Sequence, residues 1–493
     1  MEISNIFLNV IIFLSLAVAY FCFYLRKKLS YWSKRGIEEL PATHWFFGHF
    51  KEGILFQASP GWHLGQLYKR ARKNAPFVGF YIFHKPCLLV KDPKIIRQIL
   101  IKDFDIFPDR NFAGNTQKDS IGLRNLFAIR GPEWKYMRQK FAPIVTKSMQ
   151  HMLRLMLQTG KPMLEYIDRQ KEKQLDAQDL SFKYAADLIA SVALGTNTDS
   201  FSNPDGEVPR ILSSYFYSFR RMLALVSVFF MPDVVDRTGS LLFFNSKFMR
   251  KVFWTAMDER EKSGEKRGDF IDFAKHLQSE QQNPLYEFSG DNLVHQAGTF
   301  FSGFESSATT AGFTLMELAR HKAFQDEARA DIRQAIEKHG WTYDAFKEMR
   351  VLEQCIREAM RMHPQVSTLD RVGKEDYKIP GTNYTIEKGT AIYISIYGLH
   401  EDPMHFENPR TYDPGRFNKD RVVSDAYLPF GAGPRMCLGT KIGLLHTKAV
   451  VSMILAHYEI HQNPEEEHVL DSRSTFTAAA DGLMIQFRKL DEN

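Results

Sequence analysis

A glycine-rich loop near the C-terminus restricts what this chain can fold into and bind more than any other segment does. Residues 428–441 read LPFGAGPRMCLGTK and contain Cys437, one of four cysteines in 493 residues. Helical periodicity follows, and the helix is expected to begin near Leu438. A helix N-terminus and its free backbone N–H groups favour a negatively charged thiolate. Gly431 and Gly433 permit positive φ angles and let a flat ligand approach the backbone. The loop therefore indicates a cysteine that serves a bound group.

The side chains around Cys437 narrow the chemistry of that group. Arg435 stands two residues before the cysteine and could pair with an anionic edge, while Phe430 could cover the sulfur. Gly439 would let the first helical turn pass close to the same ligand. The full pattern, F-x-x-G-x-R-x-C-x-G with Gly433 as its first glycine, favours haem held by Cys437. For an isolated cysteine the alternative is a buried structural residue beside a glycine turn.

Composition and charge exclude several classes of protein. The chain has a formal net charge of +6, with 44% hydrophobic and 25% charged residues, so it is globular and mildly basic. It lacks the dense Lys/Arg tracts of a nucleic-acid-binding protein. A basic face for an acidic protein or an anionic membrane is the milder interpretation. The four cysteines are scattered without C-x-x-C spacing, which favours reduced thiols in a cytosol-facing protein.

The N-terminus predicts a membrane anchor. Residues 6–25 contain no charged side chain, and a run of about twenty such residues suits a helix that spans a bilayer. Residues 26–28 are Arg-Lys-Lys, and basic residues stay on the cytosolic side, so Met1 should face the lumen. A cleaved signal peptide is the weaker alternative, because no basic region precedes the apolar run and no small-x-small cleavage site follows it. We therefore expect a single-pass protein with a large cytosolic body.

The rest of the chain divides into a short linker and one large body. The predicted parts are an anchor at residues 1–28, a stiff linker at 29–45 and a catalytic domain at 46–493. The body reads as mainly α with a small β part. Helices are expected over 133–166, 181–194, 292–320 and 439–457, a hairpin over 77–90, a strand pair over 389–399 and a strand in the tail 475–487.

Further motifs occur in a fixed order, and with the cysteine loop they resemble the cytochrome P450 monooxygenase family. The chain contains counterparts of the family's E-x-x-R, P-x-R-F and W-x-x-x-R motifs, and SGFES where the family has A-G-x-[DE]-T. The anchor and its basic flank are similar to the microsomal, insect-type branch that handles foreign compounds. The resemblance covers essentially the whole chain and implies a P450 fold, with haem between a long central helix and the cysteine loop. The matching residues are Glu358, Arg361, Arg416, Trp134, Arg138 and the segment 302–306.

Glu358 and Arg361 stand one helical turn apart and can form an ion pair. Such a pair is ordinarily a solvated surface feature, but Arg416 in the downstream DPGRF segment could join it as a second cation. Gly415 in that segment departs from the usual Glu and leaves Arg416 in place. We interpret the three charged residues as a structural lock near the cysteine loop, with no catalytic role.

Two haem propionates need cations, and the resemblance implies where these lie. Trp134 and Arg138 fall one turn apart on one face of a helix, and Arg371 and Arg435 add two more positive charges. Arg110 in FPDRN is a further candidate. The alternative for the helical pair is a core tryptophan beside an exposed arginine.

The segment 292–320 reads as a long buried helix interrupted by small hydroxylic residues. The interruption predicts a notch where dioxygen could bind, with Glu305 and Ser306 close enough to relay protons. A helix-packing patch of glycine and serine is the alternative. The sequence departs from the family twice, because Ser302 replaces Ala and Ser306 replaces Thr. Serine lacks the methyl that restricts the rotamer, so proton delivery is expected to be less ordered.

The resemblance implies a haem b enzyme that inserts one oxygen atom of O2 into a small hydrophobic substrate. Electrons would come from NADPH through the membrane-bound NADPH–cytochrome P450 reductase, and a small b-type cytochrome is a further candidate partner. The expected location is the endoplasmic reticulum membrane, with membrane lipid as a contact and no nucleic acid. Xenobiotics, insecticides, steroids and lipids remain open as substrates. FFSGF and SVFFMPD could supply aromatic pocket walls.

Two other functions are compatible with a haem-thiolate loop. A haem-thiolate isomerase or dehydratase would need neither O2 nor a reductase, and a non-catalytic membrane protein could use the same scaffold. Glu305 and Ser306 favour the monooxygenase over the isomerase, and the presence of Cys437 argues against the non-catalytic protein. His295, His363 and His400 show no metal-ligand spacing and are interpreted as structural.

Overall fold

The computed structural model describes residues 2–41, 44–112, 121, 123–143, 149–170, 173–207, 209–211, 218–238, 246–421 and 423–491. Within helices, the side chains of residues 2–8, 10 and 300–302 also lie outside this description. The predicted departure at Ser302 falls in that group. The helices are α1 (Glu2–Leu29), α2 (Lys51–Ile54), α3 (Pro60–Arg70), α4 (Pro93–Arg97), α5 (Gly131–Phe141), α7 (Met149–Arg169), α8 (Ala177–Ala193), α10 (Phe219–Phe230), α11 (Pro232–Thr238), α12 (Ser246–Ser263), α13 (Phe270–Ser279), α14 (Asp291–Arg320), α15 (Lys322–His339), α16 (Tyr343–Glu348), α17 (Arg350–Met362), α18 (Ile396–His400) and α19 (Thr440–His457).

The strands form three small sheets. The first has the order β1-β2-β7-β4, in which β2 and β7 run parallel and the other neighbours are antiparallel. The second has the order β3-β9-β8, and β5 pairs with β6. The mainly α prediction with a small β part is confirmed. The strands are β1 (Phe77–Ile82), β2 (Lys85–Val90), β3 (Gln174–Asp176), β4 (Thr368–Val372), β5 (Tyr377–Lys378), β6 (Thr385–Ile386), β7 (Ala391–Ser395), β8 (Tyr458–His461) and β9 (Met484–Lys489).

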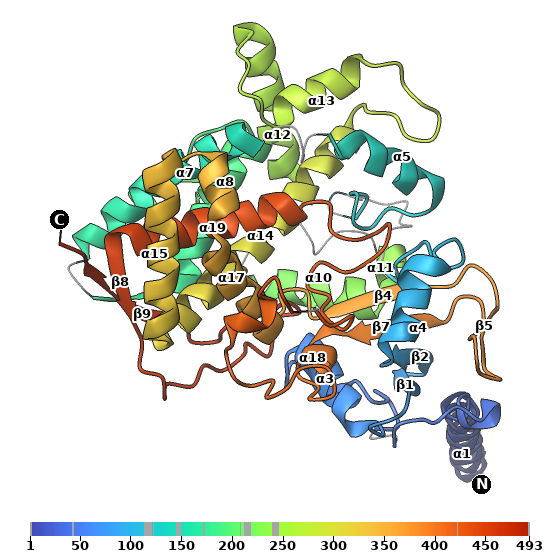
Figure 1. Ribbon diagram of the computed structural model, residues 1–493. Helices are drawn as coiled ribbons and strands as arrows, with labels where there is room; N and C mark the ends of the chain where they lie inside the picture. Colours follow the sequence, from blue (N-terminus) through green and yellow to red (C-terminus); the bar gives the residue numbers. More distant parts are fainter. Residues whose placement is uncertain are drawn as a thin grey trace.

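The core consists of two apolar clusters, one helical and one built on the four-stranded sheet. Helix α14 runs through the helical cluster and packs against α8, α17 and α19. The sheet cluster combines β1, β2, β4 and β7 with the apolar face of α10. Figure 1 shows the helical layer on one side and the sheet with α4 on the other. Burial of apolar side chains in both clusters is the main source of stability for such a body.

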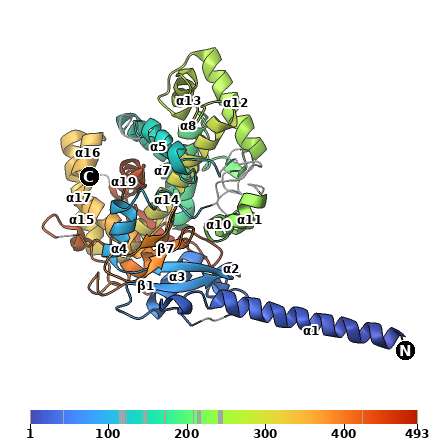
Figure 2. The ribbon, with the colours of Figure 1, turned by 90° about the vertical axis from the view of Figure 1, so that its right-hand side faces the viewer.

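Helix α1 projects away from the rest of the molecule, as Figure 2 shows. Within the described residues, no helix meets both the length and the hydropathy required to cross a membrane. Immediately after α1 the chain packs onto the sheet: Trp32 is 1% exposed, and its Nε1 donates to the Phe80 carbonyl at 3.1 Å. The backbone of Glu39 also bridges to Gly79 in β1.

Most predicted elements near the site are present, with two differences. The hairpin over 77–90 and the helix over 292–320 are confirmed. The strand pair over 389–399 is wrong, because only β7 is a strand and α18 follows it directly. The Ser395 hydroxyl accepts the Gly398 N–H at 3.0 Å and so caps the start of α18, a local signal that the β-branched pattern concealed. The predicted helix over 133–166 is divided into α5 and α7.

Candidate active site

The cysteine loop is a tight hairpin that leads into α19. The Cys437 N–H donates to the Phe430 carbonyl at 2.9 Å, which closes the loop. Gly431 has φ 70° and Gly433 has φ 75°, the region that only glycine adopts without strain. At Gly433 a Cβ would also lie 1.9 Å from the Leu100 carbonyl oxygen. The positive φ angle and the close contact with the protein's own backbone therefore both require glycine at position 433.

The Cys437 side chain is exposed although protein surrounds it closely, the pattern of a side chain that faces an internal space. Burial raises the pKa of this thiol, and the Gly439 N–H and the Arg138 charge offset the rise only in part. The backbone N–H and the positive charge lower the pKa, as the sequence predicted, but desolvation outweighs them for the free thiol. A coordinated metal ion removes the thiol proton outright, so the loop suits a metal ligand better than a free nucleophile.

Two buried arginines, one from strand β4 and one from the cysteine loop itself, lie close together. Arg371 on β4 and Arg435 in the loop are 1% and 5% exposed. Burial, followed by the charge of nearby Arg110, lowers the pKa of both groups to about 9. Among the described residues, Arg371 Nε and Arg435 Nε and Nη1 have no hydrogen-bond partner. Buried guanidinium groups with unused N–H donors are costly unless an anion pairs with them.

Four further groups complete an electrostatic cluster around these two arginines. Arg110 is buried and its Nη1 lies 3.7 Å from Asp370 Oδ1, while Arg435 Nη2 donates to Asp109 Oδ1 at 3.1 Å. Arg130 donates to the Phe112 carbonyl at 2.7 Å and acts on Arg435 through its charge. We call Arg110, Arg130, Arg371 and Arg435 the arginine cluster.

The arginine cluster fits haem by its charge. Among the described residues, its four guanidinium groups face two carboxylates, those of Asp109 and Asp370, which leaves a surplus of two positive charges within this set. The two propionates of haem would balance that surplus, and the unused N–H groups would supply the hydrogen bonds. The sequence had suggested Arg371, Arg435 and Arg110; it missed Arg130, Asp109 and Asp370, which carry no motif of their own.

Trp134 and Arg138 lie on α5 at the border of this cluster. Trp134 is 7% exposed, and the Arg435 guanidinium sits over its indole ring at 4.4 Å from the ring centroid. Arg138 is half-buried, and burial lowers the pKa of its guanidinium while the Cys437 thiol opposes that change. The two residues therefore sit on the same face of α5. Trp134 lies close to Arg435 and Arg138 to Cys437, the two loop residues that the sequence had assigned to the haem.

Helix α14 is continuous, and its hydroxyl groups bond back to the preceding turn. Ser306 and Ser307 donate to the Gly303 carbonyl at 2.9 and 3.0 Å. Gly303 is exposed, and a Cβ added there would meet nothing within 4 Å. The helix is therefore open on the Gly303 side, as the predicted notch requires, although its backbone is unbroken.

Glu305 forms a buried ion pair that the sequence did not predict. Its carboxylate accepts a short hydrogen bond from Arg221 on α10, and both residues are less than 8% exposed. Because α10 belongs to the sheet cluster and α14 to the helical cluster, this pair connects the two halves of the core. The pairing restrains the acid, so any proton transfer by Glu305 must involve release or sharing of Arg221.

The three residues of the predicted lock meet in the interior. Glu358 and Arg361 are both fully buried, and Arg361 donates two parallel bonds of 2.8 Å to the Glu358 carboxylate. Arg416 Nε donates to the same carboxylate at 3.2 Å, and the Asp413 N–H adds a bond of 3.0 Å. Removal of a buried carboxylate that accepts this many hydrogen bonds leaves several N–H donors unpaired at once.

His400 links the lock to the cysteine loop. Burial lowers its pKa to about 3, so the ring is neutral at physiological pH. Its Nδ1 lies 3.0 Å from the Arg361 carbonyl oxygen, and its Nε2 accepts the Leu428 N–H at 3.1 Å. The lock therefore positions the first residue of the segment that carries Cys437, a connection without a sequence signal.

The aromatic residues proposed as pocket walls lie in two environments. Phe229 and Phe230 on α10 are buried against aromatic partners from the sheet cluster, including Phe112 and Tyr393. Phe304 on α14 packs edge-on against His446 of α19. The side chains of Phe300 and Phe301 lie outside the described residues.

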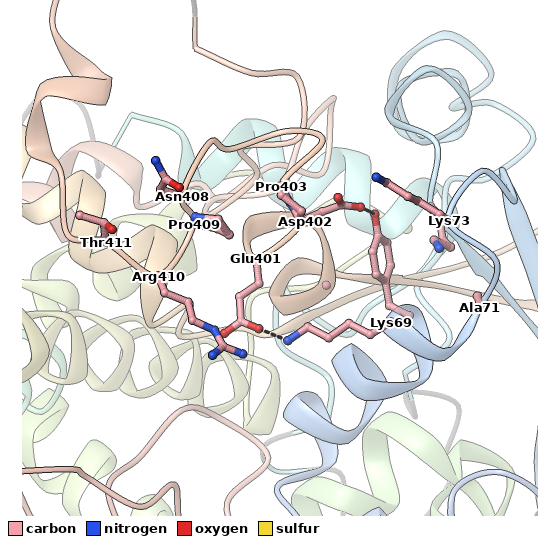
Figure 3. Close-up of a pocket in the computed structure, with 13 residues that line it drawn as sticks. Lys69, Ala71, Lys73, Glu401, Asp402, Pro403, Asn408, Pro409, Arg410 and Thr411 are labelled. Atoms are coloured by element: carbon pink, nitrogen blue, oxygen red, sulfur yellow. Dashed lines mark hydrogen bonds and ion pairs between the residues drawn. The ribbon is translucent and has the colours of Figure 1, made fainter.

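A separate surface pocket lies between α3 and the segment after α18, as Figure 3 shows. Lys69 and Glu401 form an ion pair across it, and the Tyr68 hydroxyl donates to Asp402 at 2.8 Å. None of the predicted site residues lines this pocket. Two of its lining residues contact the lock through their backbone. The Asn408 carbonyl accepts a bond from Arg416, and the Thr411 carbonyl accepts one from Arg361.

A helical body with a cysteine in a glycine loop, beside arginines that need two anionic groups, defines a haem-thiolate class of protein. Comparison with known proteins agrees: the family model described as Cytochrome P450 matches residues 39–487. Cytochrome P450 6k1 of Blattella germanica is 34% identical, over 97% of this chain and 96% of that protein. The Drosophila melanogaster protein named Probable cytochrome P450 6g2 is 32% identical, over 94% and 95% of the two chains.

The chain therefore belongs to the cytochrome P450 family and is similar to insect members of it. It is a P450 monooxygenase, and its cofactor is haem b with a cysteine thiolate as iron ligand.

Proposed function

We propose that this monooxygenase inserts one atom of O2 into small hydrophobic foreign compounds, with Cys437 as the iron ligand. The observation that carries the proposal is the exposed sulfur of Cys437 in its enclosed surroundings, beside an arginine cluster with two unmatched charges. Bound haem with the Cys437 thiolate as its iron ligand would supply the activation of dioxygen for insertion into a C–H bond. Insecticides, steroids and lipids are the other hydrophobic classes that such a site could accept.

The roles of the surrounding residues follow from their contacts. Arg371, Arg435 and Arg110 would hold the propionates, with Arg138 as a further cation. Trp134 would fix the plane of Arg435, since the two stack. The loop residues Phe430, Gly433 and Gly439 would shape the surroundings of the sulfur, because the loop closes on Phe430 and the Cβ position of Gly439 lies 3.9 Å from Cys437 Sγ.

Glu305 and Ser306 would deliver protons on the opposite side, from helix α14. The Ser306 hydroxyl is half-buried and donates to the Gly303 carbonyl, where the helix is open. Glu305 is held by Arg221, so its carboxylate can accept and pass on a proton only when that pair opens. A restrained acid and a serine in place of threonine both favour slow, imperfectly ordered proton delivery.

Replacing Ser306 with alanine is expected to lower the product formed per NADPH by about tenfold and to raise hydrogen peroxide release. The Ser306 hydroxyl donates to the Gly303 carbonyl, and the alanine variant has no group to take its place. The measurement is the ratio of product to peroxide at equal NADPH consumption. Ser307→Ala is the matched control, because Ser307 bonds to the same carbonyl but is buried against α19. Equal ratios in the wild type and Ser306→Ala would argue against the relay.

The membrane and redox partners are part of the same proposal. Residues 1–28 would anchor the protein in the endoplasmic reticulum membrane, and residues 46–493 would form the cytosolic catalytic domain. Residues 29–45 would link the anchor to that domain. Two features support an anchor: α1 projects from the body, and its described side chains over 11–24 are exposed and apolar. NADPH–cytochrome P450 reductase would supply electrons, with a small b-type cytochrome as a second donor. Lys441, exposed in the first turn of α19, is one cation that could meet an acidic partner near Cys437.

The test is turnover of a panel of hydrophobic compounds by the purified protein with reductase. Product formation that requires both NADPH and O2 would support the monooxygenase reaction proposed here. Rearranged product in the absence of NADPH would instead indicate an isomerase or dehydratase. A panel divided into insecticides, steroids and fatty acids would then identify the preferred class, because turnover rates within one apolar pocket differ by about 10–200-fold per misplaced methylene.

A further inference from the structure

A buried carboxylate in the arginine cluster has no assigned role. Asp370 lies on β4 next to Arg371 and is 1% exposed. Neither of its side-chain oxygens has a hydrogen-bond partner among the described residues. Its nearest cationic atom is Arg110 Nη1 at 3.7 Å, and that nitrogen also lacks a hydrogen-bond partner in the described chain. Burying an ionised carboxylate without hydrogen bonds is unfavourable, so this position calls for an explanation.

Asp370 and Arg371 are neighbours on strand β4, and a side-chain bond connects them. Strand β4 is buried over its first four residues and pairs with β7, where Asp370 stands opposite Tyr393. Arg371 Nη1 donates to the Asp370 carbonyl at 2.7 Å, which holds the two residues in one arrangement. The negative charge of Asp370 also favours the charged form of three arginines, Arg110, Arg371 and Arg435. Asp370 is thus electrostatically coupled to three of the four arginines.

We propose that Asp370 is a positioning residue that shares Arg110 with a haem propionate and keeps the reduction potential of the haem low. The proposal rests on the haem placement proposed above. Arg110 is sandwiched between Asp370 and the Phe127 ring, 4.0 Å from the ring centroid, so the carboxylate and the aromatic face together orient its guanidinium. A fixed negative charge in a poorly solvated site disfavours the arrival of an electron nearby.

The decisive experiment is a spectroelectrochemical titration of the haem-loaded protein and four variants. Asp370→Asn preserves the shape and removes the charge, and should shift the midpoint potential upward. Arg110→Gln removes the opposing charge and should shift it downward. The double variant should lie closer to the wild type than either single variant, because the two charges cancel locally. Asp370→Glu should restore a potential near that of the wild type.

Asp187→Asn is the matched control, because it removes another buried carboxylate that bonds instead to Thr198 and Ser200. It should lower thermal stability without moving the potential. An unchanged potential in Asp370→Asn would overturn the proposal, and so would failure of both Asp370→Asn and the double variant to bind haem, which would assign Asp370 to folding alone. Failure of the proposed function is distinguishable, because the wild-type protein would then show no haem absorption to titrate.

Discussion

Cys437→Ser is expected to abolish the strongly red-shifted Soret absorption of the reduced protein under carbon monoxide, together with all monooxygenase activity. That absorption depends on a thiolate bound to iron, and an alcohol oxygen is a much weaker donor that stays protonated. The effect should be complete, because Cys437 is the only cysteine of the four in the glycine loop and the only exposed one of the described body that follows α1. The measurement is the difference spectrum of purified protein at matched concentration.

Cys87→Ala provides the control for loss of a thiol elsewhere. Cys87 is buried in β2, and burial raises the pKa of its thiol to about 12, so it acts as a small apolar side chain. Its replacement should leave the red-shifted absorption in place. Retention of an unchanged spectrum in Cys437→Ser would contradict the assignment of the iron ligand and the function built on it.

Glu358→Ala is expected to yield protein without bound haem and with greatly reduced stability. The change leaves two guanidinium groups, the fully buried one of Arg361 and the half-buried one of Arg416, without the carboxylate that both contact. Breaking a buried ion pair by removing one partner costs about 3–5 kcal/mol. Here the loss is transmitted to the cysteine loop, since the Arg361 carbonyl holds His400 and His400 holds Leu428. The measurements are the molar ratio of haem to protein and the midpoint of thermal unfolding.

A surface glutamate tests whether the effect is specific to the lock. Glu348 at the end of α16 also accepts bonds from a cationic side chain, Lys338, but it is exposed. Glu348→Ala should change neither haem content nor the unfolding midpoint measurably, because solvent screens such pairs. Full haem content in Glu358→Ala would show that the buried pair is dispensable for the loop.

The parts of the site that the sequence predicted consist of residues that lie close together along the chain. Glu358 and Arg361 lie one turn apart on α17, and Phe430 to Gly439 lie in one loop, so neighbours in sequence become neighbours in space. The mainly helical fold was accessible for a similar reason, because periodicity over 292–320 and 439–457 survives in α14 and α19.

What the sequence could not predict depends on contacts between distant segments. Asp109 pairs with Arg435 across 326 residues, and Arg221 pairs with Glu305 across 84. No spacing rule relates such residues: the roles expected of Arg435 and Glu305 did not reveal their partners, and Asp109 and Arg221 look like ordinary surface charges in the sequence. The sequence also did not predict the desolvation of Cys437, because that burial arises from packing of distant segments around the loop.

The route from the lock to the cysteine loop has a consequence for how the enzyme is made. Glu358, Arg361, His400, Arg416 and Leu428 come from segments spread along the last third of the polypeptide, and their contacts are mutually dependent. A chain still attached to the ribosome cannot assemble them until nearly all of it has emerged. We therefore expect the cysteine loop to reach its haem-binding arrangement only after most of the chain has been synthesised.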